Sequence, residues 1–191
     1  MKLITIINNH SEEGNLPRYY LKADTALLRN NDAFYIPDDV GRVVAEPHIV
    51  VKVSRLAKCI GERFASRCID GVMGGVTFTA KDRLDAARRE GLPWDEAVGF
   101  DHSSALSLDT LQRDAMLAGA TFYINGEERA RITLDAMRFS PDKVLSHLSE
   151  CMTLRIGDLV YLGSPAEFEV KAGDNYRLTI GDHTLLNFDI K

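Results

Sequence analysis

Residues 44–101 carry the clearest structural pattern of the chain and read VAEPHIVVKVSRLAKCIGERFASRCIDGVMGGVTFTAKDRLDAARREGLPWDEAVGFD. An apolar, β-branched run at 49–53 predicts a core strand, and a second at 72–78, loosened by glycines, predicts another. A helix should follow from Thr79 as its N-cap, and Gly91 should end it. The sequence therefore predicts two neighbouring strands that lead directly into a helix.

The entrance to the first of these strands carries two polar side chains that should share one face. Side chains at positions i and i+2 of a strand point the same way, so Glu46 and His48 should lie together. Pro47 between them cannot donate a ladder hydrogen bond. We therefore expect that Pro47 lies at the beginning of the strand or that the strand is an edge strand. Both alternatives place Glu46 and His48 near a rim that water can reach.

The remainder of the chain adds further strands and one more capped helix. The segment Lys2–Ile7 predicts a first strand, and Asn125-Gly126 between alternating runs predicts a β-hairpin. Ser140 before a proline predicts a helix N-terminus, and Gly181 marks a second hairpin. Without a linker or an internal repeat, we expect one α+β domain over residues 1–191.

Composition excludes several classes of partner. The chain has 191 residues and a formal net charge of −5, which argues against nucleic acid. No apolar run is long enough for a membrane span, and the apolar start is too short for a signal peptide. The three cysteines fit no metal spacing, so we expect reduced thiols and a cytoplasmic location.

Several motifs, in order along the chain, resemble those of the fumarylacetoacetate hydrolase family. The family has Glu-x-Glu entering a strand, then Asp-x-Thr-Ala-Arg-Asp-x-x-Gln, then Lys-x-Phe-Asp. The corresponding segments here lie at 46–48, 77–85 and 98–101, and the carboxy-terminal half adds further short matches. Those matches are Asn125-Gly126, Met137-Arg138-Phe139, Thr153-Leu154-Arg155-Ile156-Gly157-Asp158, Gly163-Ser164-Pro165 and Gly173-Asp174.

The resemblance implies a fold, a chemistry and an assembly. It implies a mixed β-sandwich roll with a few peripheral helices, and usually a homodimer. Members of the family hydrolyse, isomerise or decarboxylate small 2-oxo acids and 1,3-dicarbonyl compounds on a divalent cation, Mg²⁺ or Mn²⁺. We therefore expect a small oxo acid as the ligand of this chain, and neither nucleic acid nor a membrane.

The resemblance also implies roles for particular residues. Three positions match the metal ligands: Glu46, His48 and Thr77. Three positions match substrate-binding residues: Lys22, in a segment like the family's Leu-Lys-Pro, Thr133 and Ser164. Four positions are candidates for catalysis: Glu13, where the family has a water-activating histidine, and Lys81, Asp82 and Asp101.

The substitutions at these positions change the expected chemistry. A hard cation prefers carboxylate oxygens, and His48 and Thr77 replace two of three carboxylates. Val98 stands where the family has a lysine, and a valine can neither orient nor protonate a substrate. Lys81 keeps a charge but loses the planar fork of arginine. We therefore expect weak or absent metal binding, and either an enzyme with impaired family chemistry or a pseudoenzyme that keeps a ligand pocket or a dimer role.

Overall fold

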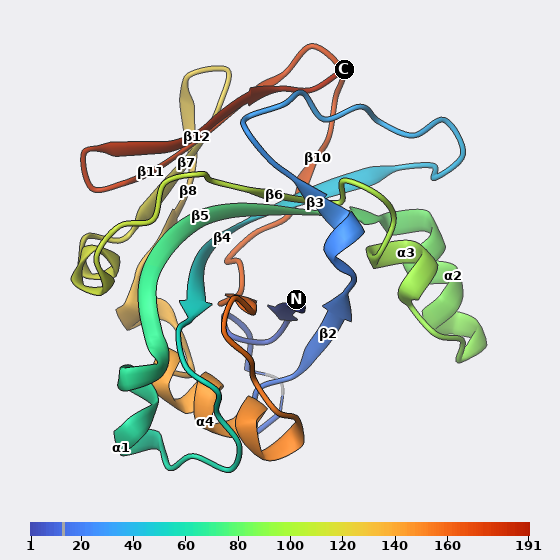
Figure 1. Cartoon of the computed structure of the whole chain (residues 1–191). Helices are drawn as coiled ribbons and strands as arrows, with labels where there is room; N and C mark the ends of the chain where they lie inside the picture. The colour runs from blue at the N-terminus through green and yellow to red at the C-terminus, as the bar shows by residue number, and fades with distance from the viewer. Residues whose placement is uncertain (13) are drawn as a thin grey trace.

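The computed structural model describes residues 1–12 and 14–191 and contains two sheets with helices at their margins (Figure 1). The larger sheet has eight strands in the order β2-β1-β9-β4-β5-β6-β3, and β10 pairs with β4 beside this path. Its strands are β1 (Leu3–Ile6), β2 (Tyr19–Lys22), β3 (Leu27–Leu28), β4 (Val43–Val53), β5 (Ile69–Ala80), β6 (Ser104–Leu106), β9 (Leu159–Tyr161) and β10 (Phe168–Glu169).

The smaller sheet packs on the outer face of the larger one. It has the order β12-β11-β7-β8. Its strands are β7 (Ala120–Ile124), β8 (Glu127–Ile132), β11 (Asn175–Ile180) and β12 (His183–Asp189). Aromatic rings fill the space between the sheets, where Phe34 stacks on Phe78 with centroids 3.7 Å apart and Phe188 meets Phe78 edge to face. This main core explains why β4 and β5 are rich in β-branched residues.

The inner face of the larger sheet is buried as well, because the sheet curls into a roll. In Figure 1, β4 and β5 bend strongly, and β2 lies across the roll from them. One part of this interior is apolar, with Leu3, Val50 and Met73 among its buried residues. Strands that are buried on both faces read as continuous apolar runs, which is the pattern at 49–53.

The second, polar part of the interior follows from the register of the strands. Glu46 pairs with Thr77 on β5, and Thr77 pairs in turn with Ser104 on β6. Thr5 on β1 pairs with Tyr20 on β2. Directly paired residues point to the same face of a sheet, so these side chains converge inside the roll.

Pro47 lies in the middle of a central strand, which corrects the expectation of a strand entrance or an edge. It pairs with Val76 on β5. On the other side of β4, β10 covers residues 44–45 and β9 covers residues 50–52, so that Pro47 falls in the gap between them. A missing N–H donor is tolerated there because no neighbouring strand requires it.

The helices lie at the margins and agree with most of the expected boundaries. They are α1 (Glu62–Ala65), α2 (Lys81–Glu90), α3 (Asp95–Val98) and α4 (Pro141–Cys151), with short 3₁₀ turns at 24–26, 66–68, 113–118 and 134–136. Ser140 caps α4 by accepting a 3.1 Å bond from the Lys143 N–H, and Gly91 ends α2 in the left-handed region, as predicted. No helix in the described part of the chain has the length and apolarity to cross a membrane.

The predicted N-cap of α2 was wrong. Thr79 is the penultimate residue of β5 and is buried, and the N-cap is Ala80, which makes no side-chain capping bond. The strand runs directly into the helix, and its alternation turns the Thr79 side chain toward the interior of the roll. The hydroxyl group is therefore part of the polar interior, and it does not cap the helix.

Candidate functional site

The three residues that match the family's metal ligands lie together on the inner face of β4 and β5. Glu46 is directly opposite Thr77, and the His48 Nε2 atom lies 2.9 Å from the Thr77 Oγ1 atom in a hydrogen bond. Gly75 faces His48, and its lack of a side chain leaves room for the Tyr161 ring, which meets His48 edge to face at 5.5 Å. The predicted convergence of Glu46, His48 and Thr77 is therefore present.

His48 is buried, whereas the sequence predicted a position near a rim that water can reach. Only 1% of its surface is exposed, because the roll closes over it. Burial lowers the pKa of His48 to about 3, and the positive charge of Lys22 lowers it further. The imidazole is consequently neutral at physiological pH and is held by Thr77.

Lys22 closes the roll from the opposite side. This lysine on β2 is 4% exposed, and its ammonium donates to the carbonyls of Phe78 and Ser103 at 3.2 and 2.7 Å. The Ser103 hydroxyl, at 3.2 Å, completes three contacts for three donors. Burial lowers the pKa of Lys22 to about 7, and the charge of Glu46 opposes this shift.

Glu46 lies between this buried interior and the surface. It is half-buried, and burial raises the pKa of its carboxyl group, while the charge of Lys22 lowers it by a smaller amount. Its side chain lines a cavity of about 200 Å³, which we call the mouth pocket. The mouth pocket is lined by Ile7, Tyr20, Val44, Glu46, Thr79, Lys81, Leu84, Arg88, Trp94, Val98 and Glu167.

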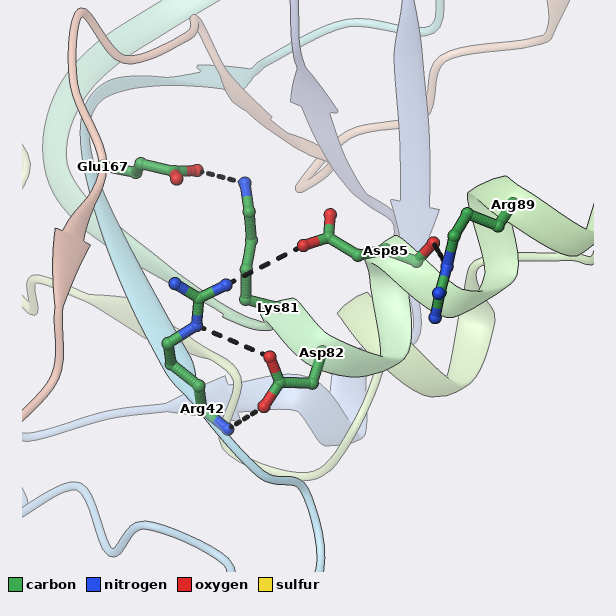
Figure 2. A network of polar contacts seen from close by, with 6 residues as sticks. All are labelled: Arg42, Lys81, Asp82, Asp85, Arg89 and Glu167. Atoms are coloured by element: carbon green, nitrogen blue, oxygen red, sulfur yellow. Dashed lines mark hydrogen bonds and ion pairs between the residues drawn. The ribbon is translucent and has the colours of Figure 1, made fainter.

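Helix α2 supplies the two cations of the mouth pocket. The Lys81 ammonium lies 2.8 Å from the carboxylate of Glu167, which comes from the segment just before β10. Figure 2 shows Lys81 extending from the first turn of α2 toward Glu167. Arg88 lies two turns further along, with its guanidinium 4.9 Å from the centre of the Trp94 ring. The mouth pocket therefore combines two carboxylates, two cations and the hydroxyls of Tyr20 and Thr79.

Four of the other predicted residues, Asp82, Asp101, Thr133 and Ser164, do not line this pocket. Asp82 is exposed and accepts a 2.9 Å bond from the Arg42 backbone N–H, on the side of α2 that Figure 2 shows facing Arg42. Asp101 is exposed in a turn. Thr133 precedes the 3₁₀ turn at 134–136, and the Ser164 hydroxyl donates to the carbonyl of Ala166. Glu13 lies outside the described residues.

The donor set does not fit a hard divalent cation. Such an ion takes six or more oxygen ligands and favours carboxylates, whereas Glu46 is the one carboxylate among the three matched positions. The Nε2 atom of His48 is already hydrogen-bonded to the Thr77 hydroxyl, and the charge of the Lys22 ammonium already stabilises the ionised form of Glu46. Within residues 1–12 and 14–191, no group of three or more His, Cys, Asp and Glu side chains is arranged to hold a metal.

Sequence reasoning missed Tyr20, Arg88 and Glu167 as residues of the pocket. Tyr20 precedes the Leu21-Lys22 segment by one residue, and Glu167 follows Gly163-Ser164-Pro165, so both adjoin motifs that were recognised. Arg88 lies on α2, outside every motif that was recognised. Its place became evident only from the packing of α2 beside Trp94.

The curled sheet, the motif order and this site define a family. The sequence profile described as the C-terminal domain of fumarylacetoacetate (FAA) hydrolase matches residues 5–190. The chain belongs to this family.

Curated relatives and solved structures agree with this assignment. The oxaloacetate tautomerase YcgM of Escherichia coli is 26% identical over 174 residues, which cover 88% of this chain and 80% of the relative. The mitochondrial oxaloacetate tautomerase FAHD1 of Arabidopsis thaliana is 26% identical over 179 residues, or 92% of this chain and 80% of the relative.

Among solved structures, a putative fumarylacetoacetate hydrolase family protein from Yersinia pestis CO92 matches with a TM-score of 0.92 and 26% identity. The match covers 100% of this chain and 93% of that one. A fumarylpyruvate hydrolase from Pseudomonas aeruginosa, solved with Mn²⁺ and pyruvate, has a TM-score of 0.90 at 22% identity, with coverage of 100% and 89%. At that identity, the second likeness shows the fold alone. The predicted α+β roll is therefore confirmed.

Proposed function

We propose that this chain binds a small 2-oxo acid in the mouth pocket and interconverts its keto and enol forms. The observation that carries this proposal is the position of Glu46, whose carboxyl group has a raised pKa and opens into a pocket that also holds Lys81 and Arg88. The curated relatives named as oxaloacetate tautomerases support this type of reaction.

The reaction needs one group that takes up and returns a proton. The Glu46 carboxylate removes a proton from the carbon next to the carbonyl, and the carbonyl oxygen then takes a proton from the resulting carboxylic acid. No atom is gained or lost, so no co-reactant is required. Burial makes Glu46 a better base than an exposed glutamate, because a pKa closer to the working pH favours proton transfer in both directions. The cations Lys81 and Arg88 would hold the acid group of the ligand.

Hydrolytic cleavage of a carbon–carbon bond makes larger demands, and Val98 stands at the position where the family has a lysine. Such a reaction needs an activated water and a stabilised carbanion, and Val98 offers neither an amine nor a charge. The second candidate is a pseudoenzyme that binds the oxo acid without turnover, and the replacement of two of the three matched carboxylates by His48 and Thr77 supports it. Both candidates share the mouth pocket and differ in whether Glu46 transfers a proton.

An enol-decay assay tests the proposal. Freshly dissolved enolic oxaloacetate loses its ultraviolet absorbance as it ketonises, and wild-type protein should accelerate this loss in the presence of a metal chelator. Glu46→Gln should reduce the acceleration by about 10²-fold or more, as for the loss of a general base. Glu169→Gln, an exposed change near Glu167, is the matched control and should behave as wild type.

The outcomes separate the two candidates. No acceleration together with calorimetric binding of oxaloacetate would identify a pseudoenzyme. No binding at all would overturn the proposed pocket. Acceleration that disappears on chelation would show that a cation supports the reaction after all.

A further inference from the structure

A second cavity adjoins the mouth pocket at the loop that joins α2 to α3. It has a volume of about 350 Å³, and we call it the apolar pocket. Three residues, Tyr20, Trp94 and Val98, line both cavities. The two spaces are therefore neighbours that share one wall. The full lining of the apolar pocket is Tyr20, Leu21, Leu92, Pro93, Trp94, Asp95 and Val98.

The shared wall is apolar and well packed. Val98 is 2% exposed and forms a small buried cluster with Leu84 and Ala97. The partly buried rings of Tyr20 and Trp94 pack against this cluster. Two aromatic rings and a buried valine therefore present carbon atoms to a ligand that reaches the boundary between the cavities.

The rim of the apolar pocket carries two large apolar side chains that remain exposed. Leu21 is 43% exposed and Leu92 is 52% exposed. The backbone of Leu92 is held in place, because its N–H donates to the Ala87 carbonyl at 2.9 Å just after Gly91 ends α2. An apolar group that covered both leucines would remove their surface from water, which is favourable.

The charges around the two cavities are distributed unequally. Lys81 and Arg88 line the mouth pocket, where they can hold an acid group. Among the described residues that line the apolar pocket, Asp95 carries the one charge, and it is exposed in the first turn of α3. A carboxylate at this place repels an acidic substituent and leaves an uncharged one unaffected.

We propose that the apolar pocket receives an aromatic ring carried on the third carbon of a 2-oxo acid, so that the chain prefers aryl-substituted oxo acids. The inference rests on the proposed function, since the oxo-acid end of the ligand occupies the mouth pocket. The ring gains from burial against Leu21 and Leu92 and from contact with the rings of Tyr20 and Trp94. Oxaloacetate still binds in the mouth pocket, but its second carboxylate gains nothing from the apolar pocket.

Three acids that differ only in the group on the third carbon provide the test. Pyruvate carries hydrogen at this position, phenylpyruvate a phenyl ring and oxaloacetate a carboxylate. Calorimetric titration of the full chain should show that phenylpyruvate binds at least about tenfold more tightly than pyruvate, because the ring is buried. Oxaloacetate should lack this advantage, and an excess of pyruvate should displace phenylpyruvate, because both acids occupy the mouth pocket.

A substitution at the rim should reverse the preference. Leu92→Lys places a cation where the ring would lie, and it should bring the affinity for phenylpyruvate within about twofold of that for pyruvate. The same change should raise the affinity for oxaloacetate by about threefold or more, a gain that an unfolded variant could not produce. Leu108→Lys alters a leucine that is 62% exposed and lines neither cavity, so this matched control should leave all three affinities unchanged.

Three results would overturn the inference. Phenylpyruvate and pyruvate would bind equally, the advantage of phenylpyruvate would survive in Leu92→Lys, or pyruvate would fail to displace phenylpyruvate, which would place the ring at another site. In the first two cases, binding of pyruvate would still uphold the proposed function. Binding of none of the three acids would instead show that the mouth pocket is not an oxo-acid site.

Discussion

His48 shows how strongly the closed roll alters the behaviour of one side chain. An imidazole with a pKa of about 3 stays neutral in the folded state under conditions in which the unfolded chain would be protonated. The folded state therefore binds fewer protons than the unfolded state between about pH 3 and 6.5. The free energy of unfolding must fall as the pH drops through this range.

The first prediction concerns this pH dependence. We expect His48→Gln to unfold with a flatter profile than wild type between pH 6.5 and about 4.5, because the variant has no imidazole to protonate on unfolding. Chemical denaturation at several pH values measures the difference. Glu46, with its raised pKa, acts in the opposite direction, and half-buried His10 acts in the same direction, but both are present in each protein and cancel in the comparison. Parallel profiles would contradict the assignment.

The second prediction restores the missing carboxylates. In His48→Glu plus Thr77→Asp, one carboxylate on the inner face becomes three, and they lie close together because residue 46 faces residue 77. Their repulsion and burial should lower the melting temperature, and about millimolar Mg²⁺ or Mn²⁺ should raise it again by mass action. Thermal melting with and without the cation measures this effect.

The matched control replaces the same residues by neutral ones, His48→Gln plus Thr77→Asn. It should melt at the same temperature with and without the cation. A folded carboxylate variant without any response to the metal would mean that these three positions do not surround a cation site.

Among the helices and strands, the sequence was sufficient to predict the features that depend only on residues close together in the chain. The Asn125-Gly126 hairpin, the Ser140 cap and the Gly91 end of α2 all agree with the sequence, because each depends on a turn or a helix end. The prediction of Thr79 as an N-cap was wrong because threonine is common both at helix N-caps and in strands. The prediction that Pro47 lies at a strand entrance or in an edge strand was wrong because the gap that accommodates it lies between β9 and β10. These strands are more than 100 residues away in the sequence.

The third prediction tests the packing of β4, β5 and β9 against one another. A Cβ at Gly75 would lie 2.6 Å from both the Tyr161 Cε1 atom and the Val50 Cγ2 atom, inside the roll. Gly75→Ala should therefore cost about 1–3 kcal/mol of stability through overpacking. Gly61→Ala, where the nearest atom is 4.0 Å away, should cost less than about 0.5 kcal/mol. Equal effects of the two changes in denaturant unfolding would contradict this account.

For the whole molecule, the sequence predicted the roll and the location of the site, but it did not predict all of the residues that line the site. Residue spacing places Glu46 and His48 on one face, and the family motifs identify β5 as the neighbour that carries Thr77. Tyr20, Arg88 and Glu167 come from three distant segments, and no local pattern connects them. Their meeting depends on the curvature of the sheet, which is a property of the complete packing.

The fourth prediction concerns assembly. Several large apolar side chains are exposed, among them Leu117 at 75%, Ile156 at 71% and Leu56 at 68%. Leu56 and Ile156 flank the bridge between Ala57 and Leu154 and so lie on adjoining loops. Such surface apolar residues favour a homodimer, and light scattering at micromolar concentration should give a mass near twice 21.3 kDa. A mass that remained monomeric over a wide concentration range would count against it.

The three bonds from Lys22 make the closure of the roll observable from outside the protein. An amine-selective reagent can modify this lysine only when β2 separates from Phe78 and Ser103 and the buried nitrogen is released. The exposed lysines will react at once, whereas the labelling rate of Lys22 will report how often the roll opens. The labelling rate of this one side chain therefore measures how often the roll opens. A ligand that bridges α2 and the core strands should lower that rate.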